Sequence, residues 1–246
     1  MLFLALLFVS FQLAVAQTSS LVQPDVAIFY PKDFKAYKTL PSLAVTQDVS
    51  QEKPLPVNWA VKPQFLQIEG KNAVQFTFPE HVDLYGTGEV LGDLRRNGTD
   101  VTLWNTDNYE YGKFEGKQLY QAHPWVLGVR KDGTSFGILA DHSWRQQIVL
   151  DDKVTFISEG PTFRVLVIEK DSPQEVMKAL GELTGTMAMP PLWALGYQQS
   201  RYSYYPDTSV KELADEFRSR KIPADVIWMD IDYMDGFRVF TFDKEG

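Results

Sequence analysis

Residues 224–235 read Ala-Asp-Val-Ile-Trp-Met-Asp-Ile-Asp-Tyr-Met-Asp, and this stretch decides how the last part of the chain folds. The apolar run predicts a buried strand, and Asp230, Asp232 and Asp235 follow it. Strands that read as continuous apolar runs are typical of parallel sheets, and β/α barrels place their functional residues at the carboxyl ends of such strands. The stretch therefore predicts a functional site at the end of a parallel strand.

The pair Asp230 and Asp232 leaves several kinds of site open. If the strand continues through both residues, their side chains share one face, roughly 6.6 Å apart. The pair could then be a glycosidase dyad, an Asp-x-Asp site for Mg²⁺ or Mn²⁺, or a clamp for sugar hydroxyls. One or both carboxylates could instead cap the strand end by binding nearby backbone. No glycine-rich phosphate loop precedes the pair, which argues against a metal–nucleotide site.

The residues before this stretch predict a β/α unit. We expect residues 192–198 to form a strand, residues 207–220 an amphipathic helix, and residues 225–230 a second strand. Two strands joined by a helix run parallel in the same sheet. Residues 186–246 are therefore predicted to belong to a β/α domain.

The middle of the chain contains short runs of apolar or alternating residues separated by turn residues. These runs are residues 65–68, 74–78, 101–104, 125–129, 136–140, 154–157 and 163–168. Asp132-Gly133 indicates a hairpin turn, and the whole pattern is typical of an antiparallel β-sandwich. Ser172-Pro173 then predicts the start of a helix that ends at Gly185. We expect the domain boundary between residues 185 and 191.

The composition excludes several classes of site. The net charge of −8 and the pI near 5.0 argue against nucleic acid or an anionic membrane as a partner. The absence of cysteine excludes disulfides, thiol nucleophiles and cysteine-based zinc sites. With three histidines in the chain, a histidine metal cluster is not expected either. We expect no metal and no cofactor.

The N-terminus predicts the compartment. Residues 1–16 form an apolar run that ends in Ala14-Val15-Ala16, which is the pattern of a secretory signal peptide cleaved before Gln17. An uncleaved membrane anchor is the alternative, but the run is short for a membrane span. We expect a secreted, periplasmic or secretory-lumen protein with no membrane contact once the signal is cleaved.

A second group of polar and aromatic residues lies in the sandwich region. Gly86 and Gly88 indicate a bent or bulged strand. We expect Trp104 to lie in the core, and Asp107, judged by its position alone, to form a turn. His123 is expected to be a structural residue just before a strand.

Together these motifs resemble the start of glycoside hydrolase family 31, which contains the α-glucosidases and their relatives. The resemblance is carried by residues 84–89, 103–107, 120–124, 133–139, 191–198, 201–202 and 222–234. It implies a galactose-mutarotase-like β-sandwich over residues 17–185. The start of a β/α TIM barrel is expected over residues 186–246. Such a barrel needs about 250 residues, and fewer than sixty follow Pro191, so we expect a truncated, N-terminal fragment.

The resemblance also assigns roles to the carboxylates. It implies that Asp230 binds hydroxyls of the sugar at the cleavage site, that Ile231 lines this pocket, and that Asp107 contacts the neighbouring subsite. The family's nucleophile and acid/base are aspartates on later barrel strands, so no catalytic residue is expected here. The expected function is the N-terminal part of a retaining α-glycosidase, inactive alone, whose substrate is an oligosaccharide or α-glucoside. The alternative is a non-catalytic carbohydrate-binding module or an inactive family member.

Overall fold

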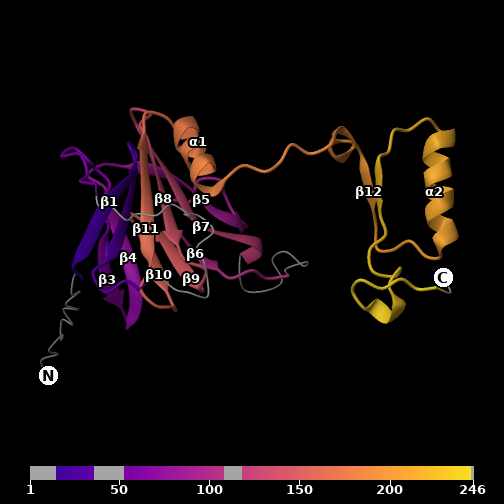
Figure 1. Ribbon diagram of the computed structural model, residues 1–246, viewed down its shortest axis with the longest axis horizontal. Coiled ribbons are helices and arrows are strands. Elements are labelled where there is room, and N and C mark those ends of the chain that lie inside the picture. The colour runs from indigo at the N-terminus through magenta and orange to yellow at the C-terminus, as the bar shows by residue number, and fades with distance from the viewer. Residues whose placement is uncertain (1–14, 36–52, 108–117, 245–246) are drawn as a thin grey trace, which may run out of the picture. The chain divides into compact units, whose positions relative to one another are not determined.

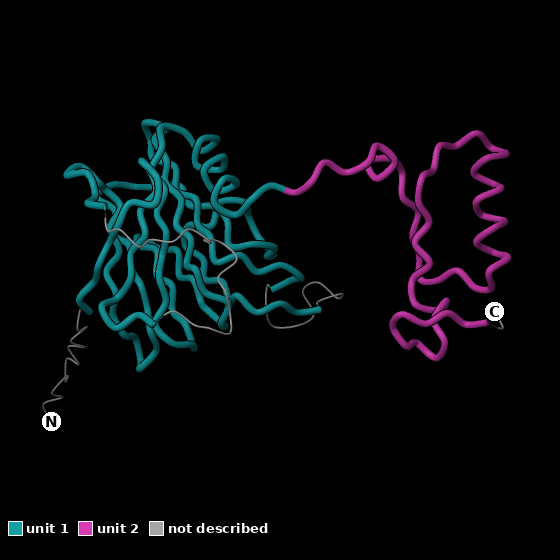
Figure 2. Tube along the Cα trace, in the orientation of Figure 1, with its two compact units in different colours: residues 1–186 teal, residues 187–246 magenta. Residues whose placement is uncertain are grey.

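The computed structural model describes residues 15–35, 53–107 and 118–244. The chain divides into two units, residues 1–186 and 187–246, each of which is described by itself (Figure 2). The expected signal peptide lies outside the described residues except for Val15 and Ala16. Among the described residues, no helix combines the length and the apolar character needed to cross a membrane.

The first unit is a sandwich of two antiparallel sheets (Figure 1). The six-stranded sheet has the order β1 (Gln17–Gln23), β2 (Val26–Pro31), β11 (Arg164–Lys170), β8 (Ser135–Asp141), β7 (Gln118–Arg130) and β5 (Val82–Val90). The five-stranded sheet has the order β3 (Gln64–Ile68), β4 (Lys71–Thr77), β10 (Lys153–Ser158), β9 (Gln146–Leu150) and β6 (Thr99–Leu103). The predicted β-sandwich is confirmed.

Two hydrophobic clusters stabilise the sandwich. The cluster between the sheets contains the fully buried rings of Phe29, Phe76, Phe136 and Phe156. A second cluster forms on the other face of the six-stranded sheet, which helix α1 (Pro173–Thr184) covers. Strand β2 is therefore buried on both faces, and its sequence lacks the alternation that marks a half-buried strand. This is why its apolar run does not stand out as a sandwich strand.

Helix α1 begins and ends where the sequence predicts. The side chain of Ser172 accepts a hydrogen bond from the backbone N–H of Glu175, and Pro173 is the first helical residue. The helix ends before Gly185, whose φ is 82°. N-capping by serine and a terminating glycine are the two features that delimit such a helix.

The second unit contains the predicted β/α unit. Its elements are the 3₁₀ helix η1 (Leu192–Leu195), β12 (Gln198–Ser200), α2 (Asp207–Ser219), β13 (Val226–Trp228) and the 3₁₀ helix η2 (Asp235–Phe237). Strands β12 and β13 pair in parallel, as expected.

The strand predicted over residues 192–198 is wrong for most of its length. The N–H of Ala194 donates to the carbonyl of Pro191, and that of Gly196 donates to Trp193, so this segment closes 3₁₀ turns instead of extending. The apolar side chains that suggested a buried strand, such as Leu192 and Leu195, are exposed in this unit. The strand begins only at Gln198.

Candidate functional site

Asp230 lies in the turn that follows β13. The strand ends at Trp228, and Asp230 has a φ of 63°, in the left-handed region that few residues other than glycine adopt. The side-chain alternation of a strand therefore does not extend to Asp232. The interpretation of Asp230 and Asp232 as a pair on one strand face is wrong.

A cavity of about 370 Å³ opens beside this turn. The residues that line it are Ser200, Ile227, Trp228, Met229, Asp230, Tyr233 and Phe242. Its volume falls within the range of about 300–1,000 Å³ that is usual for small-molecule sites. The lining combines aromatic and aliphatic side chains with one carboxylate, which suits a ligand that has an apolar face and a rim of hydroxyl groups.

Two contacts hold the aromatic side chains of this cavity in place. The indole Nε1 of Trp228 donates a hydrogen bond of 2.8 Å to Oε1 of Gln198 on the neighbouring strand. The rings of Tyr233 and Phe242 pack with their centroids 5.5 Å apart. Because these contacts lie within the second unit, its own residues shape this cavity.

The neighbours of Asp230 are placed differently. Ile231, with 38% of its surface exposed, is not among the residues that line the cavity, and neither is Asp232. Asp235 forms an ion pair with Arg238. The carboxylate of Asp230, by contrast, has no hydrogen bond or ion pair within residues 187–244. Of these aspartates, Asp230 is therefore the one whose oxygens are available to a ligand in this cavity.

Asp107 belongs to the first unit and lies in the loop after β6. Its Oδ1 accepts a hydrogen bond of 2.8 Å from the hydroxyl of Tyr120, on β7. Trp104 begins this loop and is 57% exposed, so the expectation that it lies in the core is wrong. The strand ends at Leu103, one residue before the indole. The same loop thus presents an exposed aromatic ring and a carboxylate.

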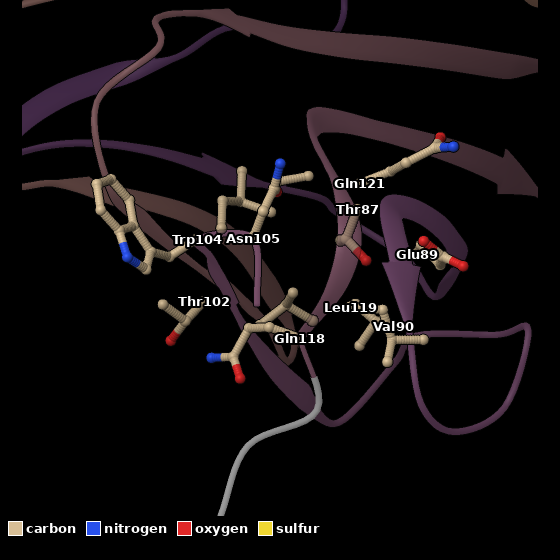
Figure 3. A pocket seen from close by; sticks show the side chains of 12 residues that line it. Thr87, Glu89, Val90, Thr102, Trp104, Asn105, Gln118, Leu119 and Gln121 are labelled. Carbon is tan, nitrogen blue, oxygen red and sulfur yellow. The ribbon is translucent and has the colours of Figure 1, made fainter. Parts of the chain in front are cut away.

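A small cavity of about 10 Å³ lies beneath this loop. Trp104 and Glu89 appear at opposite ends of its lining in Figure 3, with Gln118 between them. About 10–15 Å³ is room for one water molecule. A sugar cannot enter this cavity, and Asp107, which is exposed, does not line it.

Strand β5 explains how Glu89 reaches β7. Gly86, Thr87 and Gly88 have φ values of 110°, 73° and 93°, and the register with β7 shifts on both sides of Gly88. The predicted bulge is confirmed. Beyond it, Oε2 of Glu89 accepts a hydrogen bond of 3.1 Å from the backbone N–H of Tyr120. No pattern in the sequence predicts the hydrogen bond between Glu89 and Tyr120 or the one between Tyr120 and Asp107.

The remaining candidates for a metal or a base are few. Within the three described ranges, no group of three or more His, Asp or Glu side chains has the geometry of a metal site. His123 is an exposed residue inside β7, not a residue that precedes a strand. Neither observation adds a ligand-binding group to the two carboxylates.

Comparison with protein families gives two matches, one for each unit. Residues 64–148 match the glycosyl hydrolase 31 N-terminal galactose mutarotase-like domain. Residues 187–246 match the glycosyl hydrolases family 31 TIM-barrel domain. The two matches follow the order of the sandwich and the β/α unit.

Individual proteins agree with the family matches. Alpha-glucosidase 2 of Bacillus thermoamyloliquefaciens is 38% identical over 210 residues, which cover 80% of this chain and 27% of that protein. The lysosomal alpha-glucosidase of Rattus norvegicus is 32% identical over 65% of this chain and 17% of that protein. The chain thus spans about a quarter or less of these relatives' length.

Solved structures give the same result. The family 31 alpha-glucosidase of Bacteroides thetaiotaomicron is 58% identical, with a TM-score of 0.63 over 68% of this chain and 29% of that one. A GH31 dextranase of Flavobacterium johnsoniae complexed with glucose has a TM-score of 0.74 over 89% of this chain and 31% of that one, and its 22% identity supports the fold alone. By sequence and by fold, the chain belongs to glycoside hydrolase family 31.

Proposed function

We propose that this chain is the N-terminal part of a retaining α-glycosidase, and specifically of an α-glucosidase that removes terminal α-linked glucose. The observation that carries the proposal is the cavity beside Asp230, where a carboxylate without a partner in its own unit meets aromatic side chains. The names of the relatives support the same activity, since they are α-glucosidases of bacterial and mammalian origin.

Asp230 would act by binding and not by breaking the bond. A carboxylate that accepts hydrogen bonds from sugar hydroxyls makes charge-assisted bonds, which are about twice as strong as neutral ones. Bonds of this kind fix the sugar ring, so that its anomeric carbon faces the attacking group. In a retaining mechanism that group is a carboxylate, and the resemblance places it on a later barrel strand. We assign no catalytic residue to this chain.

Asp107 and Ile231 have lesser roles in this proposal. Asp107 would accept a hydrogen bond from the sugar unit next to the cleaved one, because its loop exposes one oxygen that Tyr120 does not bind. Ile231 would contact the ligand as an exposed apolar side chain at the turn after Asp230. Both assignments rest on the resemblance to the family.

The compartment is also part of the proposal. The apolar run of residues 1–16 supports export, so the enzyme would act outside the cytoplasm, as a secreted, periplasmic or secretory-lumen protein. An α-glucosidase in such a place would act on oligosaccharides that have not entered the cytoplasm. N-terminal sequencing of the exported protein, with Gln17 expected first, tests this part.

The function is tested in the complete enzyme with Asp230→Ala and an aryl α-glucoside as substrate. Loss of a charged hydrogen-bond acceptor costs about 1.5–3 kcal/mol per bond, so kcat/KM should fall by roughly a hundredfold. Asp215→Asn, an exposed aspartate on α2, is the matched control and should retain normal turnover. Near-normal turnover by Asp230→Ala would overturn the role of Asp230, and no turnover by the unaltered enzyme would overturn the α-glucosidase assignment.

A further inference from the structure

The loop that carries Asp107 is attached to the opposite sheet. It follows β6 of the five-stranded sheet, yet two hydrogen bonds join its described part to β7 of the six-stranded sheet (Figure 1 shows the strands). The backbone N–H of Thr106 donates to the carbonyl of Leu119 at 2.8 Å. The hydroxyl of Tyr120 donates to Oδ1 of Asp107 at 2.8 Å. One bond fixes the loop's backbone, and the other fixes the carboxylate.

The backbone of Tyr120 also has a hydrogen-bond partner. Its backbone N–H donates to Oε2 of Glu89 on β5, which replaces the ladder bonds lost where the register shifts. Glycine is required for this bulge, because an added Cβ at Gly88 would lie 2.6 Å from the carbonyl oxygen of Gln121. Three residues from three segments thus form one connected series, in which Glu89 binds the backbone of Tyr120 and the hydroxyl of Tyr120 binds Asp107.

This series has a chemical consequence for Asp107. An aspartate on a loop samples several side-chain rotamers, and a hydrogen bond to one of its oxygens restricts them. The oxygen that accepts this bond has less capacity to accept another from a ligand. The second oxygen is left to accept a bond from a ligand, in a direction that the tyrosine fixes. Fixing a binding group in advance raises affinity because the entropy of ordering it has been lost before the ligand arrives.

We infer that Tyr120 is a positioning residue for Asp107, and that it gives the enzyme its preference for a substrate with a sugar on both sides of the cleaved bond. The inference rests on the proposed function, since it takes Asp107 to bind the second sugar. A disaccharide presents hydroxyl groups to the fixed carboxylate, whereas an aryl leaving group presents none. The effect of Tyr120 should therefore depend on the leaving group.

The test uses Tyr120→Phe in the complete enzyme, with maltose and an aryl α-glucoside as parallel substrates. The variant removes one hydroxyl and keeps the ring. We expect KM for maltose to rise about tenfold, the ratio that corresponds to one hydrogen bond, while kcat changes little. Turnover of the aryl α-glucoside should stay within about twofold, as for a neutral surface substitution. Tyr85→Phe, whose hydroxyl has no hydrogen-bond partner in the described part of the chain, is the matched control.

Two further experiments separate positioning from a general loss of structure. In an Asp107→Ala background, Tyr120→Phe should cause no additional change for maltose, because the two residues act as one unit. Glu89→Ala should raise KM for maltose in the same way as Tyr120→Phe, and Glu89→Gln, which keeps an acceptor oxygen, should restore most of the affinity.

The outcomes distinguish the inference from the function on which it rests. Equal losses on both substrates, or unchanged kinetics on maltose, would overturn the role of Tyr120 and leave the α-glucosidase assignment intact. Absence of activity in the unaltered enzyme would remove the function itself. An additive effect in the Asp107→Ala background would show that Tyr120 acts through another group and would also overturn the inference.

Discussion

The indole of Trp125 lies directly over Gly137 on the neighbouring strand, and a Cβ added at Gly137 would come within 2.0 Å of the ring. The same arrangement occurs on the opposite face of the sheet, where the ring of Phe136 lies over Gly128 and would meet an added Cβ at 2.1 Å. Each of the strands β7 and β8 thus has a glycine that is covered by an aromatic ring of the other strand. The packing of the two rings on the sheet therefore requires that positions 128 and 137 have no side chain.

Gly137→Ala should therefore destabilise the sandwich. The methyl group cannot be accommodated without moving a buried indole, and overpacking of this kind costs about 1–3 kcal/mol. Gly181→Ala is the matched control, since an added Cβ there meets only a methyl group of Thr186 at 3.8 Å. Because Gly181 lies inside α1, alanine should stabilise by about 0.5–1 kcal/mol. Urea denaturation followed by tryptophan fluorescence measures both; equal shifts in the two variants would contradict the packing argument.

The ion pair between Arg164 and Asp141 should contribute more to stability than the surface pairs do. Nε of Arg164 donates to Oδ2 of Asp141 at 2.6 Å, and the two side chains are only 18% and 5% exposed. Arg164→Met takes a cationic partner from the largely buried carboxylate of Asp141, so the substitution should cost about 2–3 kcal/mol. Lys211→Met, which breaks an exposed pair with Asp207, should cost much less, because solvent screens that pair. A similar small cost for both variants would show that the buried pair is not stabilising.

Acid should weaken the sandwich through His142. Its ring is stacked on Phe163 with centroids 5.0 Å apart, and Nε2 lies 2.7 Å from the hydroxyl oxygen of Ser158. Burial lowers the pKa of His142 to about 4, against a smaller opposing effect of Asp141. In the unfolded chain the pKa of His142 is near 6.5, so the unfolded state binds a proton first as the pH falls. Stability is therefore lost between about pH 6.5 and pH 4.

The loss attributable to His142 is about 1–2 kcal/mol after allowance for the solvent that reaches the ring. The measurement is the slope of the unfolding free energy against pH, compared between the unaltered protein and His142→Asn. The variant should have a shallower slope over that interval, whatever its absolute stability. An unchanged slope in His142→Asn would show that another group is responsible.

Trp228 should affect ligand binding through its orientation. Its Nε1 donates to Gln198, and its ring lines the cavity beside Asp230. Gln198→Leu removes the acceptor from an indole that is 57% exposed, and the net contribution of such a hydrogen bond is about 0.5–1.5 kcal/mol. We expect inhibition by glucose to weaken by roughly tenfold in the complete enzyme. Gln199→Leu, one residue along the same strand, is the comparison, and an equal effect there would argue for a general change in β12.

Much of the fold follows from local patterns in the sequence. The hairpin predicted from Asp132-Gly133 is confirmed, because the N–H of Gly133 donates to the carbonyl of Arg130 at 3.0 Å. The serine cap and the terminating glycine delimit α1. Strand β2 and the segment of η1 were not predictable from these patterns, each for its own physical reason. Strand β2 is apolar on both faces, whereas the apolar segment of η1 is bent into 3₁₀ turns by its backbone bonds.

The site was less predictable than the fold. Asp230 and Asp107 were found because each stands in a short motif that resembles a known family. Tyr120 and Glu89 also stand in stretches that carry the resemblance, but their contacts could not be predicted, since these bonds join segments that are distant in the sequence and meet only through the strand order. Asp230 and Asp232 do not share one strand face, because the left-handed conformation of Asp230 ends the alternation of side chains along the strand.

That left-handed conformation restricts which amino acids position 230 can hold. The backbone there favours Gly, Asn and Asp, whereas the proposed role requires an oxygen acceptor on a short side chain. Glu keeps the charge but meets the steric penalty, and Gly meets no penalty but has no oxygen. In a library of all twenty residues at this position, folding and sugar binding should therefore select different sets, with Asp and Asn as their overlap.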